Sequence, residues 1–72
     1  MKTIIAIIPT SIDRRDIESY EGTHFNSIQQ LNDFLETTFK VQCFTESLGE
    51  FTTRINDEDY PTDAWVAYFY IN

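Results

Sequence analysis

The order of apolar and polar positions along the chain predicts three strands. Residues 3–8 form a continuous apolar run with four isoleucines, which is typical of a central strand buried on both faces, and Pro9 ends the run. Residues 64–71 give the strongest strand pattern, because every residue except two alanines is β-branched or aromatic. Residues 40–45 alternate more weakly and predict a further strand between these two.

Two other segments carry apolar residues at spacings of three and four, the period of an amphipathic helix. Residues 27–39 predict a helix that begins at a serine capping box. Residues 46–56 allow two interpretations. Ser47 followed by Glu50 is a second capping box and favours a short helix, whereas Gly49 and the two threonines that follow are compatible with a hairpin.

These elements predict an α+β fold in a single domain over residues 1–72. The order is β-α-β-α-β, and the expected architecture is a small two-layer domain in which a three-stranded sheet carries two helices on one face. The alternative order β-α-β-β-β follows if residues 46–56 form a hairpin. The polar segment 10–24, with one helical turn near residues 13–19, is long for a loop in so small a domain, so we expect it to be partly ordered or functional.

The last strand also predicts a surface. Trp65 and Phe69 project to one face of the sheet, and Tyr68 and Tyr70 project to the other. Because two short helices cover only one face, we expect the tyrosines on an open face, and tyrosine is enriched at protein interfaces. The alternatives are that segment 10–24 folds over this face, or that a second copy of the chain pairs with it.

Charge narrows the classes of partner. The chain has 12 acidic and 5 basic residues, a net charge of −7. Nucleic acids and anionic membranes are bound mainly through lysine and arginine, so we expect neither as a partner. The charge is compatible with solubility alone, and also with a partner protein that has a basic surface.

The carboxylates concentrate after residue 56. A solvated loop is the simplest interpretation, and the segment lacks the spacing and glycine of a calcium loop. The functional alternative is a surface that mimics nucleic-acid phosphates and occupies a basic groove, as small acidic inhibitors from mobile elements do. The expected partner-binding residues are Asp57, Glu58, Asp59, Asp63, Tyr68 and Tyr70.

Signals for catalysis are weak. The two glycines cannot build a phosphate-binding loop, and a lone Cys43 and a lone His24 fall short of the four ligands of a structural zinc site. We interpret Cys43 as a small buried hydrophobic residue rather than a nucleophile paired with His24. We therefore expect no catalytic residue, metal or cofactor.

The N-terminal apolar run ends at Ile8 and is followed by proline and charged residues. It is too short for a signal peptide or a membrane span, and a single cysteine fits a reducing compartment, so we expect a cytoplasmic protein. The leading hypothesis is a small acidic protein-binding module, an inhibitor or an adaptor. The alternative is a homo-oligomeric structural subunit that assembles through its aromatic sheet face.

Overall fold

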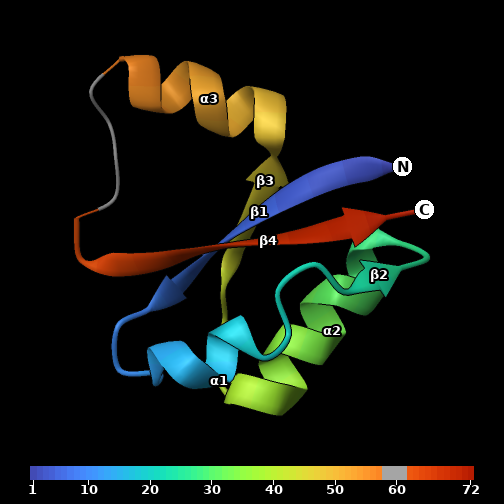
Figure 1. Cartoon of the computed structure of the whole chain (residues 1–72), viewed down its shortest axis with the longest axis vertical. Coiled ribbons are helices and arrows are strands. Elements are labelled where there is room, and N and C mark those ends of the chain that lie inside the picture. The colour runs from blue at the N-terminus through green and yellow to red at the C-terminus, as the bar shows by residue number, and fades with distance from the viewer. Residues whose placement is uncertain (58–61) are drawn as a thin grey trace.

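The computed structural model describes residues 1–57 and 62–72. Within them the chain forms β1 (Lys2–Pro9), α1 (Arg14–Glu18), β2 (His24–Phe25), α2 (Ile28–Phe39), β3 (Phe44–Ser47), α3 (Leu48–Asn56) and β4 (Ala64–Ile71) (Figure 1). The predicted α+β class is confirmed. Within the segment that joins β1 to α2, the short helix α1 forms where a helical turn was predicted, and the short strand β2 is an additional element.

The strands form one sheet in the order β2-β4-β1-β3. As its continuous apolar run predicts, β1 is central and pairs antiparallel with β3 and β4. The β1–β4 ladder runs from Lys2 opposite Ile71 to Pro9 opposite Ala64, and β2 adds parallel to the other side of β4. The prediction of three strands was wrong by this one strand, because a two-residue strand has no periodicity of its own.

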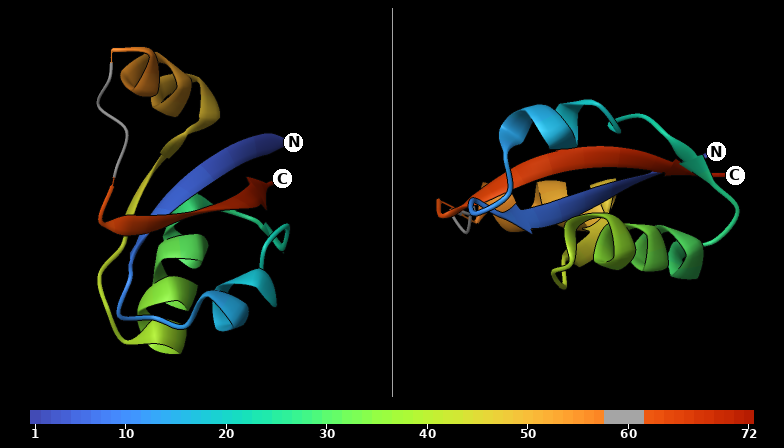
Figure 2. Two further views of the ribbon diagram at one scale, coloured as in Figure 1. Left: turned by 60° about the vertical axis from the view of Figure 1, so that its left-hand side comes forward. Right: turned by 90° about the horizontal axis from the view of Figure 1, so that it is seen from below.

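The helices do not share one face of the sheet. Figure 2 shows β1 and β4 between α3 on one side and α2 on the other. The prediction of two helices on one face was therefore wrong. α3 begins directly after the last residue of β3, so no linker is available to carry it to the α2 side. The main core lies under α2 and consists of Ile4, Ala6, Ile8, Ile17, Leu31, Leu35, Phe39, Ala67 and Phe69.

Serine caps start both longer helices, as the sequence predicts. In α2, the Ser27 hydroxyl accepts a hydrogen bond from the Gln30 amide (3.2 Å), and the Gln30 side chain accepts one from the Asn26 amide (3.1 Å). The helix ends at Lys40, which takes a left-handed conformation with φ 58°. These contacts satisfy amide and carbonyl groups that have no partner inside the helix.

In α3, the Ser47 hydroxyl accepts from the Glu50 amide (3.2 Å) and donates to the Glu50 carboxylate (2.9 Å). The helical interpretation of residues 46–56 is confirmed, and the hairpin alternative is wrong. The strand predicted at residues 40–45 begins later, at Phe44, because the chain first leaves α2 through the left-handed Lys40.

The segment between β1 and α2 lies along the outer edge of β4. The Gly22 amide donates to the Tyr68 carbonyl (2.9 Å), and the Tyr70 amide donates to the Thr23 carbonyl (3.0 Å). β2 continues this pairing to the end of the strand. The segment is thus ordered, and it closes an edge that would otherwise expose unpaired backbone groups.

Arg14 and Trp65 fix the start of this segment. The Arg14 guanidinium donates to the Val66 carbonyl (3.2 Å) and lies 5.8 Å from the centre of the Trp65 ring. The Trp65 indole N–H donates to the Ile12 carbonyl (2.9 Å). α1 is therefore held against β4 by contacts between residues more than 50 positions apart in sequence.

Two glycine-to-alanine substitutions should have opposite effects on stability. Gly22 has a φ of +82°, and a Cβ there would lie 3.4 Å from the Tyr68 ring, whereas a Cβ on Gly49 in α3 meets nothing within 4 Å. We expect Gly22→Ala to lower the free energy of unfolding by about 1–2 kcal/mol and Gly49→Ala to raise it by about 0.5–1 kcal/mol. Urea unfolding followed by circular dichroism measures both, and two changes of the same sign would contradict this account.

Candidate protein-binding surface

The side of the sheet opposite α2 carries the candidate surface. The strand register places Tyr68 beside Ile5 and Val66 beside Ile7 on this side. On the far side of β1, Phe44 is also opposite Ile7. We call this surface the open face, and its residues are Thr3, Ile5, Ile7, Phe44, Glu46, Val66, Tyr68 and Tyr70.

Large aromatic side chains remain exposed on the open face. Phe44 is 59% exposed and Tyr68 is 41% exposed, while Ile5 between their strands is 6% exposed. The centre of the face is thus buried and its two flanks present aromatic rings to solvent. Exposed aromatic groups around a buried centre are typical of a surface that contacts another molecule.

The two tyrosines form a cluster with a residue that the sequence analysis did not select. The Tyr68 and Tyr70 rings are 5.8 Å apart, and the His24 ring lies 5.0 Å from that of Tyr70. The Nδ1 atom of His24 is 3.0 Å from the Asn72 side-chain oxygen. Alternation along β4 was enough to predict that the tyrosines share a face, but nothing in the sequence indicated that His24 would pair beside them.

Arg54 of α3 organises the other flank. Its guanidinium lies 5.8 Å from the Phe44 ring centre and 5.6 Å from that of Phe51, and its Nε donates to the Glu46 carboxylate (3.1 Å). The Glu46 side chain is only 8% exposed. The Arg54 guanidinium, paired with Glu46, thus lies beside the exposed Phe44 ring, and a cation in this position is attracted to the face of an aromatic ring.

The acidic residues lie apart from the tyrosines. Asp57 caps the end of α3, where its amide donates to the Arg54 carbonyl (3.1 Å), and Asp63 directly precedes β4; both are exposed. Glu58 and Asp59 lie outside the described residues. Since Asp63 is five residues from Tyr68 along the chain, the two are separated by about 17 Å. The predicted site residues therefore do not form one patch: Asp57 is at the end of α3, Asp63 precedes β4, and the tyrosines lie farther along β4.

The structure also places the residues considered for catalysis. His24 lies on the strand at one edge of the sheet, opposite Tyr70, whereas Cys43 precedes the strand at the opposite edge. The two edges are three strand spacings, about 14 Å, apart, and the two residues also lie toward opposite ends of the sheet. They are too far apart to act as a nucleophile and its base. Burial raises the pKa of the Cys43 thiol. In residues 1–57 and 62–72, no three His, Cys, Asp or Glu side chains gather as metal ligands.

The chain matches no family model, and comparisons with curated proteins and with solved structures found no match either. No helix in the part of the chain that the structure describes is long and apolar enough to span a bilayer. The interpretation of the surface therefore depends on its own geometry and charge.

Arg54→Met should destabilise the fold, because it leaves the Glu46 carboxylate without its charged partner. The loss should be about 2 kcal/mol, less than for a fully buried ion pair, since the Arg54 side chain is 29% exposed. The double variant Arg54→Met/Glu46→Leu should recover most of the loss. Urea unfolding of the two single variants and the double variant tests this, and a double variant as unstable as the sum of the singles would contradict the pairing.

Cys43 should react more slowly in the folded chain than in the unfolded chain. Its raised pKa leaves less thiolate at a given pH, and the thiolate is the reactive form. Because folding raises this pKa, the stability that the thiol contributes is present below its ordinary pKa and is lost as the pH rises through the raised value. Iodoacetamide alkylation near pH 8, with and without urea, measures the effect, and equal rates would rule it out.

Proposed function

We propose that the protein is a cytoplasmic, non-catalytic binding module that acts as an inhibitor or adaptor by engaging another protein through the open face. The observation that carries the proposal is the exposure of Phe44 and Tyr68 on a sheet face that α3 covers only in part. Aromatic side chains supply much of the binding energy in protein interfaces, because they bury a large area at a low cost in side-chain entropy.

The net charge of −7 favours a partner with a basic surface. Asp57 and Asp63, with Glu58 and Asp59 between them in sequence, would act at the rim of the contact. Rim carboxylates chiefly speed the encounter and select partners, while the buried contacts set the lifetime of the complex. The separation of the described acidic residues from the tyrosine rings fits this division of roles. A basic groove that normally holds nucleic-acid phosphates is one partner that such charges would suit.

Self-assembly through the same face is the second candidate function, and the exposed aromatic rings favour it equally. Charge distinguishes the two. Two copies would each bring a net charge of −7 to the contact, and like charges oppose association. We therefore favour a foreign, basic partner over a second copy of the chain.

Light scattering coupled to size exclusion, at low and at high salt, separates these candidates. We expect a monomer at both salt concentrations. A dimer that persists in high salt and dissociates in Tyr68→Ser would overturn the proposal in favour of the structural subunit.

Substitution of the exposed aromatics should weaken capture of the partner. We expect Phe44→Ser and Tyr68→Ser each to reduce the affinity at least tenfold, because each removes an aromatic anchor. Asp57→Asn/Asp63→Asn should mainly slow association and flatten its salt dependence. Quantitative pull-down from source-cell lysate, followed by surface plasmon resonance with the purified partner, measures both effects.

The matched control is Thr37→Ser, at an exposed position on α2 away from the open face. It should bind as the unmodified chain does. Retention of full affinity by both aromatic variants would reject the open face as the binding surface.

A further inference from the structure

The two edges of the sheet differ in a way that indicates a second contact surface. The β4 edge is closed by β2 and by the residues before it. At the other edge, β3 pairs with β1 on one side, and no strand in residues 1–57 or 62–72 pairs with its other side. In an antiparallel pair, alternate residues of an edge strand direct their N–H and C=O groups outward, and such groups can accept an additional strand.

Two hollows lie along β3, on the side of the sheet that α2 covers. Between the two hollows, the Thr45 hydroxyl donates a hydrogen bond to the Asn32 side-chain oxygen (3.0 Å). The first hollow, of about 370 Å³, includes Ile4, Ile28, Ile71 and Glu50 in its lining. The second, of about 230 Å³, is lined by Asn32, Glu36, Gln42 and Cys43.

The spacing of the hollows suits an extended chain. Side chains of a strand alternate between its faces, so those on one face are about 6.7 Å apart. In a strand laid along β3, one side chain on the α2 side would lie over the contact between Thr45 and Asn32. The side chains two positions before it and two positions after it point to the same side. These two are four positions and about 13 Å apart, and they would lie against the two hollows.

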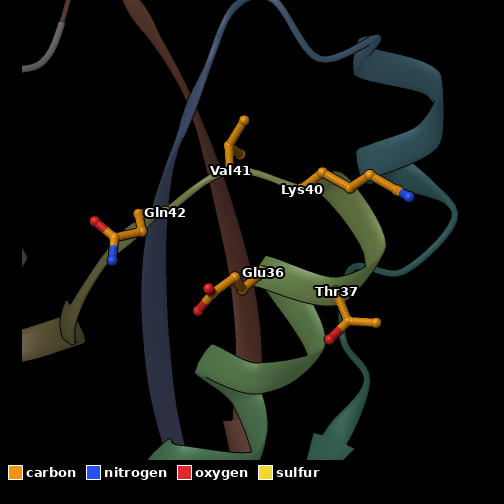
Figure 3. Close-up of a pocket in the computed structure, with 5 residues that line it drawn as sticks. All are labelled: Glu36, Thr37, Lys40, Val41 and Gln42. Carbon is orange, nitrogen blue, oxygen red and sulfur yellow. The ribbon is translucent and has the colours of Figure 1, made fainter.

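The second hollow favours a basic side chain. Figure 3 shows Glu36 extending from α2 toward Gln42, while Lys40 extends in the opposite direction. Glu36 also lines the adjoining hollow of about 450 Å³ that the figure presents. Its carboxylate is thus directed to the space beside the start of β3 and is not paired with Lys40 in any ion pair of the described residues.

The first hollow favours an apolar side chain. Three isoleucines contribute to its lining, and one of them, Ile28, is 43% exposed although it lies on the apolar side of α2. Lys2, Glu46 and Glu50 also line this hollow. Glu46 is paired with Arg54, and the charges of Lys2 and Glu50 offset each other. Burial of the exposed part of Ile28 by a partner would remove apolar surface from water, which is favourable.

We propose that the free edge of β3 binds an extended, basic segment of a partner protein as an added strand. A lysine or arginine of that segment lies against Glu36, and an apolar residue four positions away lies against Ile28. The inference rests on the proposed function only in that the partner is a protein. The two hollows lie on the α2 side of the sheet, opposite the open face, and Phe44 and Glu46 are the residues of β3 that the two proposed surfaces share. A second copy of the chain is a poorer occupant, because it would bring carboxylates to the same contact.

The test uses the full chain labelled with ¹⁵N and a short synthetic peptide. The peptide has a lysine and an isoleucine four positions apart in a threonine-rich background. We expect saturable shifts of the amide signals of residues 44–47 and of the Asn32 side-chain amide. A peptide with glutamate in place of lysine should bind at least tenfold more weakly. A peptide methylated at every second backbone nitrogen, on the edge that would pair with β3, should not bind, because it cannot donate the strand hydrogen bonds.

Substitution in the chain provides the matched comparison. Glu36→Gln should weaken the lysine peptide about three- to tenfold, as expected when one charge is removed from a partly exposed pair. Glu18→Gln, which removes an exposed carboxylate of α1 at the other edge of the sheet, should leave the affinity unchanged.

Four results would overturn the inference. They are equal binding of the N-methylated peptide, equal weakening by Glu18→Gln, absence of shifts at residues 44–47, and shifts at these residues on self-association without peptide. Shifts confined to Val66, Tyr68 and Tyr70 would overturn it while supporting the open face. Conversely, Phe44→Ser and Tyr68→Ser could leave the affinity for the partner unchanged while the peptide still binds at β3. That result would reject the open face as a binding surface and leave the proposal for β3 standing.

Discussion

The pairing of β1 with β4 is the contact on which the other elements depend. It joins the first and last strands from Lys2 opposite Ile71 to Pro9 opposite Ala64, so its formation closes a loop of most of the chain. Loop closure costs conformational entropy that only later contacts offset. β3 then adds to the free side of β1, and β2 adds to the free side of β4. The apolar residues of both strands form the floor on which α2 packs.

The sequence predicted the elements whose signals are local. The isoleucine run marked β1, the aromatic run marked β4, and the serine caps marked the starts of α2 and α3. The strand β2 and the placement of α3 could not be predicted in this way. β2 exists because β4 offers an edge to pair with, and the side on which α3 lies is set by its direct connection to β3. Both depend on contacts distant in sequence.

The candidate surface was likewise predictable only where its signals are local in sequence. Alternation in β4 predicted that Tyr68 and Tyr70 share a face, and the register of the sheet confirms it. Phe44 was missed, because its place beside Ile7 depends on how β3 pairs with β1. The tyrosines and the carboxylates are separate features of the sequence, and Asp63 does lie at the opposite end of β4 from Tyr70. The binding roles of all these residues remain predictions.

The two ends of the described chain emerge side by side. Lys2 and Ile71 are paired, and Figure 1 shows the N- and C-termini at the same end of the sheet. A domain with adjacent ends can be inserted into a surface loop of another protein without separating the two parts of its host. It also tolerates circular permutation, in which a short linker joins the old ends and new ends open elsewhere. The chain can therefore be carried, reordered or built into larger assemblies through attachments at one end of its sheet.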